Sequence, residues 1–274
     1  MLKRARLAAG VKIEDVKQAT GLSVPALYRH EGGYTAIKPE LVPVYAKMYQ
    51  VDDEAEIAKW TKWAQKGKSE GTWATAGGML GPSYEDYADA ETLCEQLRFY
   101  EPHVIHGLLQ TTEYSRAAIA TDAMVHSTNE RRQEELLRLR ESRKQLLARE
   151  DPPPPRIWAI LGESAVLTPP SPGDKDAHRE QVERLLQLQS PQMTLQILPM
   201  DTGLHAGMSG SFSILTFDIN VDMVFREGYG DGAFFDEDRQ VLDYRVRFES
   251  LQSQALSPAA SRRYLQKLRR QLAE

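Results

Sequence analysis

The stretch that decides the fold lies near the start of the chain, where residues 13–31 read IEDVKQATGLSVPALYRHE. Its spacing predicts two short helices that meet at a steep angle across a tight turn, and such a turn needs a residue able to adopt φ > 0. Gly21 stands at that point, and Ser23 is a good N-cap for the second helix. The pattern favours a helix-turn-helix in which Val16 and Leu27 face inward.

A helix-turn-helix that binds DNA places the N-terminal half of its second helix in the major groove. Arg29 is the best base reader here, because arginine can make a bidentate contact to guanine. Ile13 is included among the candidates, although its spacing also places it inward. The alternative is an ordinary pair of packed helices, since Gly and Ser are common at turns. The candidate DNA contacts are Lys12, Ile13, Lys17, Ser23, Val24, Pro25, Tyr28, Arg29 and Lys38.

This region resembles the XRE (Cro/repressor-like) helix-turn-helix family. The resemblance implies a DNA-binding head of five helices. Three positions depart from the family pattern: Lys17 replaces a small Ala, His30 an apolar residue, and Ile13 a common Gln or Thr. These changes leave few side chains for reading bases, so a second hypothesis is a head that serves as a docking surface. The matching positions are Arg6-x-x-Ala9-Gly10, Glu14-Asp15-Val16, Gly21-Leu22-Ser23 and Arg29-x-Glu31-x-Gly33.

The charge distribution separates the start of the chain from the remainder. Residues 1–50 hold eight Lys and Arg against four Asp and Glu, a net charge of +4, whereas the whole chain carries −5. The other residues therefore carry −9. A small basic head on an acidic body fits a DNA-binding protein, and phosphate contacts would make its affinity strongly dependent on salt.

Length and composition set further limits. The chain has 274 residues, of which 41% are apolar and 27% charged, a balance typical of soluble globular proteins. The single cysteine excludes an intrachain disulfide and a zinc site built from several cysteines. No apolar run approaches the length of a membrane span, and the first residues lack the apolar core of a signal peptide. We therefore expect a cytoplasmic location and no membrane contact.

Helix signals continue on both sides of the motif. A first helix over residues 2–9 should end at Gly10, and Pro39 should open a fourth helix. A fifth, capped by Asp52 or Asp53, should run to about residue 64. We predict a mainly α, five-helix HTH domain at 1–66. Residues 67–82, rich in Gly, Ser, Thr and Lys, are the predicted linker.

The second domain, at 83–274, is predicted to be α+β with a small mixed sheet. Its first helix should begin at Tyr84 and keep helical spacing through Leu97. Strands are expected only after the proline run 152–155, and the order strand, helix, strand predicts a crossover followed by a meander. Helices are expected from residue 112, over 130–149, 178–189 and 239–254, and from 258, with strands at 156–161, 193–199, 211–217 and 222–227.

The string YEPHVIHGLLQTTEYSRAAI at 100–119 resembles the signature P-G-L-L-Q-T-x-x-Y-A-R-A of the antitoxin-like domain in actinobacterial WhiJ-type regulators, with His106 for the Pro and Ser115 for an Ala. The match continues in order to Ala255-Leu256-Ser257-Pro258. This resemblance implies an antitoxin-like, regulatory and dimerisation domain, whose DNA binding is altered by a small companion protein encoded nearby. We expect double-stranded DNA as a partner, and a homodimer, because specific affinity usually needs two half-sites.

Two segments keep alternative interpretations. The helix at 130–149 can be a solvated helix with one buried stripe or a dimer-forming helix. The Gly-rich loop 203–210 can be a flexible connector or a contact for a partner or ligand.

Residues that could support chemistry are present but scattered. His103 and His106 lie beside Pro102 and Gly107, a loop unlike the helix of a zinc site. The Gly-rich run 228–232 lacks the helix start that cradles phosphate. We expect no enzymatic activity, cofactor or metal. A hydrolytic trio can be assembled on paper from Glu163, His205 and either Asp201 or Ser209, but no motif fixes its geometry.

Overall fold

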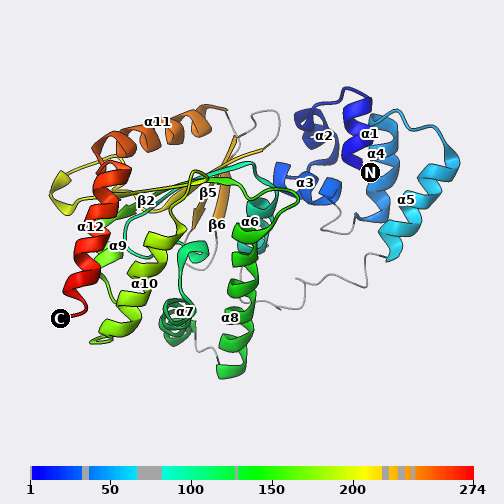
Figure 1. The fold of residues 1–274 in the computed structure, drawn as a ribbon. Coiled ribbons are helices and arrows are strands. Elements are labelled where there is room, and N and C mark those ends of the chain that lie inside the picture. The colour runs from blue at the N-terminus through cyan, green and yellow to red at the C-terminus, as the bar shows by residue number, and fades with distance from the viewer. Residues whose placement is uncertain are drawn as a thin grey trace. The chain divides into compact units, whose positions relative to one another are not determined.

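The computed structural model describes residues 2–32, 37–66, 82–126, 129–217, 222–227, 232–235 and 238–274, most of them helical (Figure 1). Contacts divide the chain into two units. Unit 1 comprises Met1–Leu93 with Tyr229–Gly232, and unit 2 comprises Cys94–Gly228 with Ala233–Glu274.

Helices form unit 1, and two glycines set its first turns. Gly10, after the first helix, and Gly21, between the second and third, adopt φ of 66° and 69°, where glycine has no steric penalty. The predicted turns at these glycines are confirmed. The helices are α1 (Leu2–Ala8), α2 (Ile13–Thr20), α3 (Val24–Gly32), α4 (Val42–Met48, preceded by the 3-10 turn Pro39–Leu41), α5 (Glu54–Lys66) and α6 (Pro82–Leu93).

A buried ion pair joins α1 to α3. The Arg6 guanidinium donates two hydrogen bonds to the Glu31 carboxylate, at 2.6 and 3.0 Å, and both side chains are 1% exposed. A third bond, of 3.2 Å, runs from Arg6 to the carbonyl of Val11 in the α1–α2 turn. One guanidinium thus holds two helices and the turn that leads into α2.

Helix α4 completes this polar core. The Tyr49 hydroxyl, beside the last turn of α4, donates to Glu31 at 3.2 Å. Burial, and then the charge of Glu31, raise the pKa of Tyr49, so its hydroxyl keeps the proton that it donates. His30 meets the Tyr45 hydroxyl at 2.6 Å, which explains how a histidine occupies a position that is apolar in the resembling family.

One mixed sheet of six strands organises unit 2, in the order β3-β2-β1-β4-β5-β6. Strands β1, β2 and β3 are parallel, while β4 is antiparallel to both β1 and β5. The predicted crossover is therefore confirmed. The strands are β1 (Gln96–Glu101), β2 (Arg156–Gly162), β3 (Met193–Leu198), β4 (Phe212–Thr216), β5 (Asp222–Glu227) and β6 (Gly232–Phe235).

Strand β1 corrects the expectation that strands appear only after the proline run. The preceding helix, predicted to reach Leu97, ends at Leu93, and β1 lies in the interior of the sheet. Phe99 and Tyr100 point to opposite sheet faces and are 0% and 2% exposed. The sequence QLRFYE mixes polar and apolar residues without a clear alternation, and Leu97 continues the helical spacing of the preceding segment, so the strand was missed. Strand β6 was also missed, and the sheet is larger than predicted.

Helices cover both faces of the sheet (Figure 1). Helix α11 (Asp238–Gln254) packs on one face, where Tyr100, Ile160 and Phe248 belong to one apolar cluster. Leu137 of α8 is 5% exposed and α8 contacts α7, in keeping with the buried-stripe interpretation of that helix. The remaining helices are α7 (Thr112–His126), α8 (Glu130–Lys144), α9 (Glu163–Leu167), α10 (Lys175–Leu188) and α12 (Pro258–Gln271).

The predicted linker lies outside the described residues, except for Pro82, which begins α6. Apart from Pro82, helix α6 falls within the sequence range predicted for the second domain. By its contacts it belongs to unit 1, where it packs against α3.

Replacing Arg6 by Met should destabilise unit 1 by about 3–5 kcal/mol, because the buried Glu31 carboxylate loses its charge partner. The double variant Arg6→Met/Glu31→Leu removes both charges and should lose much less. Hydrogen exchange of the α1 and α3 amides under increasing denaturant measures this free energy of unfolding separately from that of unit 2. If the single and the double variant lost the same free energy of unfolding, the loss could not be due to the unpaired Glu31 carboxylate.

Candidate nucleic-acid interface

The turn between α2 and α3 has the geometry of a helix-turn-helix. Gly21 caps α2 in the left-handed conformation, and its N–H donates to the carbonyl of Lys17 at 2.9 Å. The Ser23 hydroxyl accepts a 3.4 Å hydrogen bond from the backbone N–H of Ala26, as the N-cap prediction requires. The turn therefore fixes the direction of α3, the helix expected to read DNA.

Basic and polar candidates remain accessible around this turn. Lys12, at the N-cap of α2, is exposed, as are Ser23 and Lys38, while Lys17 is half-buried. Of Pro25 and Arg29, the structure describes only the backbone, which lies in α3. Three of the predicted DNA contacts, Lys12, Ser23 and Lys38, are thus at the surface.

Three predicted DNA contacts require correction. Ile13 is 0% exposed and is part of the unit 1 core, as its helical spacing also indicated. Val24 and Tyr28, one turn apart on α3, are 3% and 5% exposed. None of these three side chains can reach a base edge in the structure as it stands.

Helix α6 contacts α3 and is acidic in sequence. The sequence of α6 holds four acidic residues, Glu85, Asp86, Asp89 and Glu91, and no basic one. Tyr87, Ala88 and Ala90 of α6 are buried. Sequence reasoning missed this contact, because α3 and α6 are separated by about fifty residues and neither carries a signal for pairing with the other.

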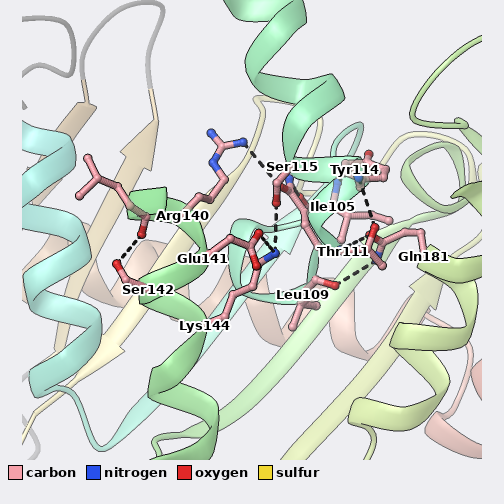
Figure 2. Close-up of polar contacts among 12 residues, drawn as sticks. Ile105, Leu109, Thr111, Tyr114, Ser115, Arg140, Glu141, Ser142, Lys144 and Gln181 are labelled. Atoms are coloured by element: carbon pink, nitrogen blue, oxygen red, sulfur yellow. Dashed lines mark hydrogen bonds and ion pairs between the residues drawn. The ribbon is translucent and has the colours of Figure 1, made fainter. Parts of the chain in front are cut away.

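In unit 2, two buried amides hold the turn between β1 and α7 (Figure 2). Gln181 of α10, 0% exposed, donates to the carbonyl of Leu109 at 3.0 Å and accepts from the backbone N–H of Thr111 at 2.7 Å. Gln110 donates to the carbonyl of Ile105 at 2.7 Å. The Gly-Leu-Leu-Gln-Thr signature is therefore a structural turn whose backbone groups are satisfied by side chains.

Cationic side chains of α8 reach the same turn (Figure 2). Lys144 donates to the Ser115 hydroxyl at 3.2 Å and to the Glu141 carboxylate at 2.6 Å. Burial lowers the pKa of Lys144, although the hydrogen bond to Glu141 opposes this change. Arg140 lies 3.5 Å from the amide oxygen of Gln110. These contacts attach α8 to the turn and to α7.

His106 is buried beside these cations. Its ring stacks on Phe99 with centroids 4.1 Å apart, and its Nδ1 accepts from the backbone N–H of Leu108 at 3.4 Å. Burial lowers the pKa of His106 well below 6.5, and the charges of Arg143 and Arg140 lower it further. The imidazole is therefore neutral in the folded protein near pH 7.

Comparison with known families identifies both parts of the chain. Residues 84–267, about two thirds of the chain, match a family described as a domain of unknown function (DUF5753). The chain belongs to the DUF5753 family. Residues 1–60 match a family described as a helix-turn-helix domain, which supports the XRE-like interpretation of unit 1. No curated protein and no solved structure gives a match.

The DUF5753 match begins within α6, so the helix that contacts α3 belongs by sequence to the DUF5753 domain. This domain therefore contributes an element to the surroundings of α3, the helix expected to read DNA.

The residues suggested for a hydrolytic trio have other partners in the DUF5753 domain. Glu163 accepts hydrogen bonds from the backbone N–H of Met200 at 2.8 Å and from the Tyr264 hydroxyl at 2.7 Å. His205 accepts at Nδ1 from the backbone N–H of Gly207 at 3.1 Å. Glu163 thus joins the 3-10 turn after β3 to α12, His205 bonds within its own loop, and no hydrogen bond joins the two among the described side chains. The absence of enzymatic activity stays a prediction.

The two histidines beside the turn also differ in environment. His103 is exposed and lies 3.4 Å from the Ser164 hydroxyl, whereas His106 is buried. Within the described ranges, no group of three or more His, Cys, Asp or Glu could hold a metal ion. No helix in those ranges is long and apolar enough to cross a membrane.

Titration of His106 should make the stability of unit 2 depend on pH. Because its pKa is lower in the folded state than the unfolded value of about 6.5, the unfolded chain binds more protons below that pH. Its contribution to stability is therefore complete above pH 6.5 and falls as the pH drops, by at most about 1.4 kcal/mol per pH unit.

Denaturant unfolding of His106→Gln from pH 7.5 to 5.5 should show a shallower loss of stability than the wild-type protein shows. The matched control is His103→Gln, which replaces an exposed histidine three residues away. The assignment of this pH dependence to His106 would be contradicted if the stability of His106→Gln fell with pH as steeply as that of the wild type. It would also be contradicted if both variants changed this dependence equally.

Proposed function

We propose that this protein is a sequence-specific, DNA-binding transcriptional regulator. The carrying observation is the α2–Gly21–α3 unit, which has helix-turn-helix geometry and lies within the helix-turn-helix match at 1–60. The excess of basic residues over 1–50, against a net charge of −5 for the whole chain, supports attraction to phosphates. Exposed Lys12 and Lys38 are the proposed phosphate contacts, and Arg29 the proposed base contact.

DNA binding, in this proposal, is modulated through the DUF5753 domain by a small partner protein or ligand. Two observations support this. Acidic α6, where the DUF5753 match begins, contacts α3, and Val24 and Tyr28 of α3 are buried. A partner that favours a different position of α6 would change the surface that α3 offers to DNA. The resemblance to antitoxin-like WhiJ-type regulators points to a small companion protein in this role.

The proposed regulator acts as a homodimer. One helix-turn-helix covers only one half-site, and two heads on an inverted repeat supply the specific affinity that one head lacks. The excess of four positive charges over residues 1–50 would be doubled in such a dimer.

Arg29→Ala should weaken the discrimination between bases. DNA fragments selected by the wild-type protein at physiological salt give the target, and the variant should lose about 1–3 kcal/mol of preference for it over scrambled DNA. Arg179→Ala, which removes a half-exposed arginine from α10, is the matched control and should retain that preference. An unchanged preference in Arg29→Ala, or sequence-blind binding by the wild type, would favour the docking-surface hypothesis.

If DNA and α6 compete for α3, DNA binding should accelerate hydrogen exchange in residues 82–93. The amides of α10 serve as the internal control, because that helix lies in unit 2 and its exchange should not change. Mass spectrometry of the full chain, with selected and with scrambled DNA, measures both segments. Stronger protection of α6 with selected DNA would contradict displacement.

A further inference from the structure

Helix α11 has one face committed to the sheet. Val241, Phe248 and Leu251 lie in the apolar cluster with the strands, and all three are at most 6% exposed. Arg245 donates to the buried Asp222 carboxylate of β5 at 2.6 Å. These contacts fix the rotation of α11 about its axis, so the residues on its opposite face are set as well.

The opposite face of α11 carries a regular exposed stripe. Leu242 and Val246 are 56% and 57% exposed, unusual values for large apolar residues. Arg239, Glu249 and Ser253 are also exposed. The five positions follow the spacing 3, 4, 3, 4, which is the seam of a coiled coil. Within the sequence of α11, these residues form a line directed away from the sheet.

This stripe is complementary to a second copy of itself that runs antiparallel. When two copies of α11 are placed antiparallel about a two-fold axis near residue 244, Leu242 of one copy faces the partner's Val246. The same operation places Arg239 opposite the partner's Glu249, so this ion pair occurs twice in the interface. A two-fold interface requires this kind of self-complementary patch.

The loop 203–210 is attached to α11 through Arg247, which lies outside the stripe. Arg247 of α11 donates to the carbonyl of Ala206 at 3.3 Å and to the Ser209 hydroxyl at 3.2 Å. In this loop, Leu204 and Met208 are 90% and 63% exposed.

We propose that α11 is the homodimer interface and that its occupant is α11 of a second copy of this chain, paired antiparallel. The inference rests on the proposed function only in that it gives the homodimeric regulator its interface. The matched apolar pair at the centre and the two reciprocal ion pairs favour a second copy over an unrelated partner.

Charge reversal tests the pairing directly, using sedimentation equilibrium of the full chain without DNA. Arg239→Glu or Glu249→Arg alone creates two like-charge contacts and should raise the dimer dissociation constant about tenfold or more. The double variant Arg239→Glu/Glu249→Arg restores both ion pairs and should return within about threefold of the wild type. The reversals place Glu near the N-terminus of α11 and Arg near its C-terminus, where the helix dipole favours these charges. Helix α11 itself should therefore remain folded.

Arg263→Glu, an exposed reversal on α12, is the matched control and should leave the dissociation constant unchanged. Leu242→Glu should give a monomer, with circular dichroism reporting a retained fold. A wild-type monomer at about 100 μM, or single reversals that weaken the dimer without rescue in the double variant, would overturn the proposal. The sedimentation experiment uses no DNA. The proposed interface can therefore be confirmed even if the selection experiment shows no sequence-specific binding.

Discussion

The buried ion pair between Arg6 and Glu31 is the interaction on which the helix-turn-helix part of the structure depends. An apolar pair of similar volume would cost less desolvation and could be equally stable. The two parallel hydrogen bonds, however, accept only one relative position of α1 and α3, and the third bond to Val11 places the start of α2. Because Tyr49 also donates to Glu31, α4 is tied to the same carboxylate.

A comparable constraint orders one face of unit 2. The Asp222 carboxylate receives hydrogen bonds from Arg98 of β1 at 2.7 Å and Arg245 of α11 at 2.6 Å, and its side chain is 2% exposed. A single buried carboxylate thus links three elements far apart in sequence. In both units, one acidic group with several donors defines the geometry, while the apolar core supplies most of the burial.

Local signals in the sequence were sufficient for most of the helices and four strands. Gly21 and Ser23 define the helix-turn-helix by their own local preferences, and the helix expected from residue 258 is α12, which begins at Pro258. Strand β1 could not be predicted, because Leu97 continues the spacing of α6 and only pairing with β2 and β4 distinguishes the two. The contact of α3 with α6 could not be predicted either, since the two helices are about fifty residues apart in the sequence.

The candidate nucleic-acid interface likewise combines features that local sequence signals predict with features that depend on tertiary contacts. The exposure of Lys12 and Lys38 could be expected from their charge and their position along the chain. The contact between α3 and α6 is tertiary and could not. Hydroxyl-radical footprinting of the wild-type protein on its selected DNA tests the central claim, that this fold reads DNA. We expect two protected patches on one face of the duplex, about one helical turn apart or a multiple of it. Uniform cleavage along the whole fragment would contradict it.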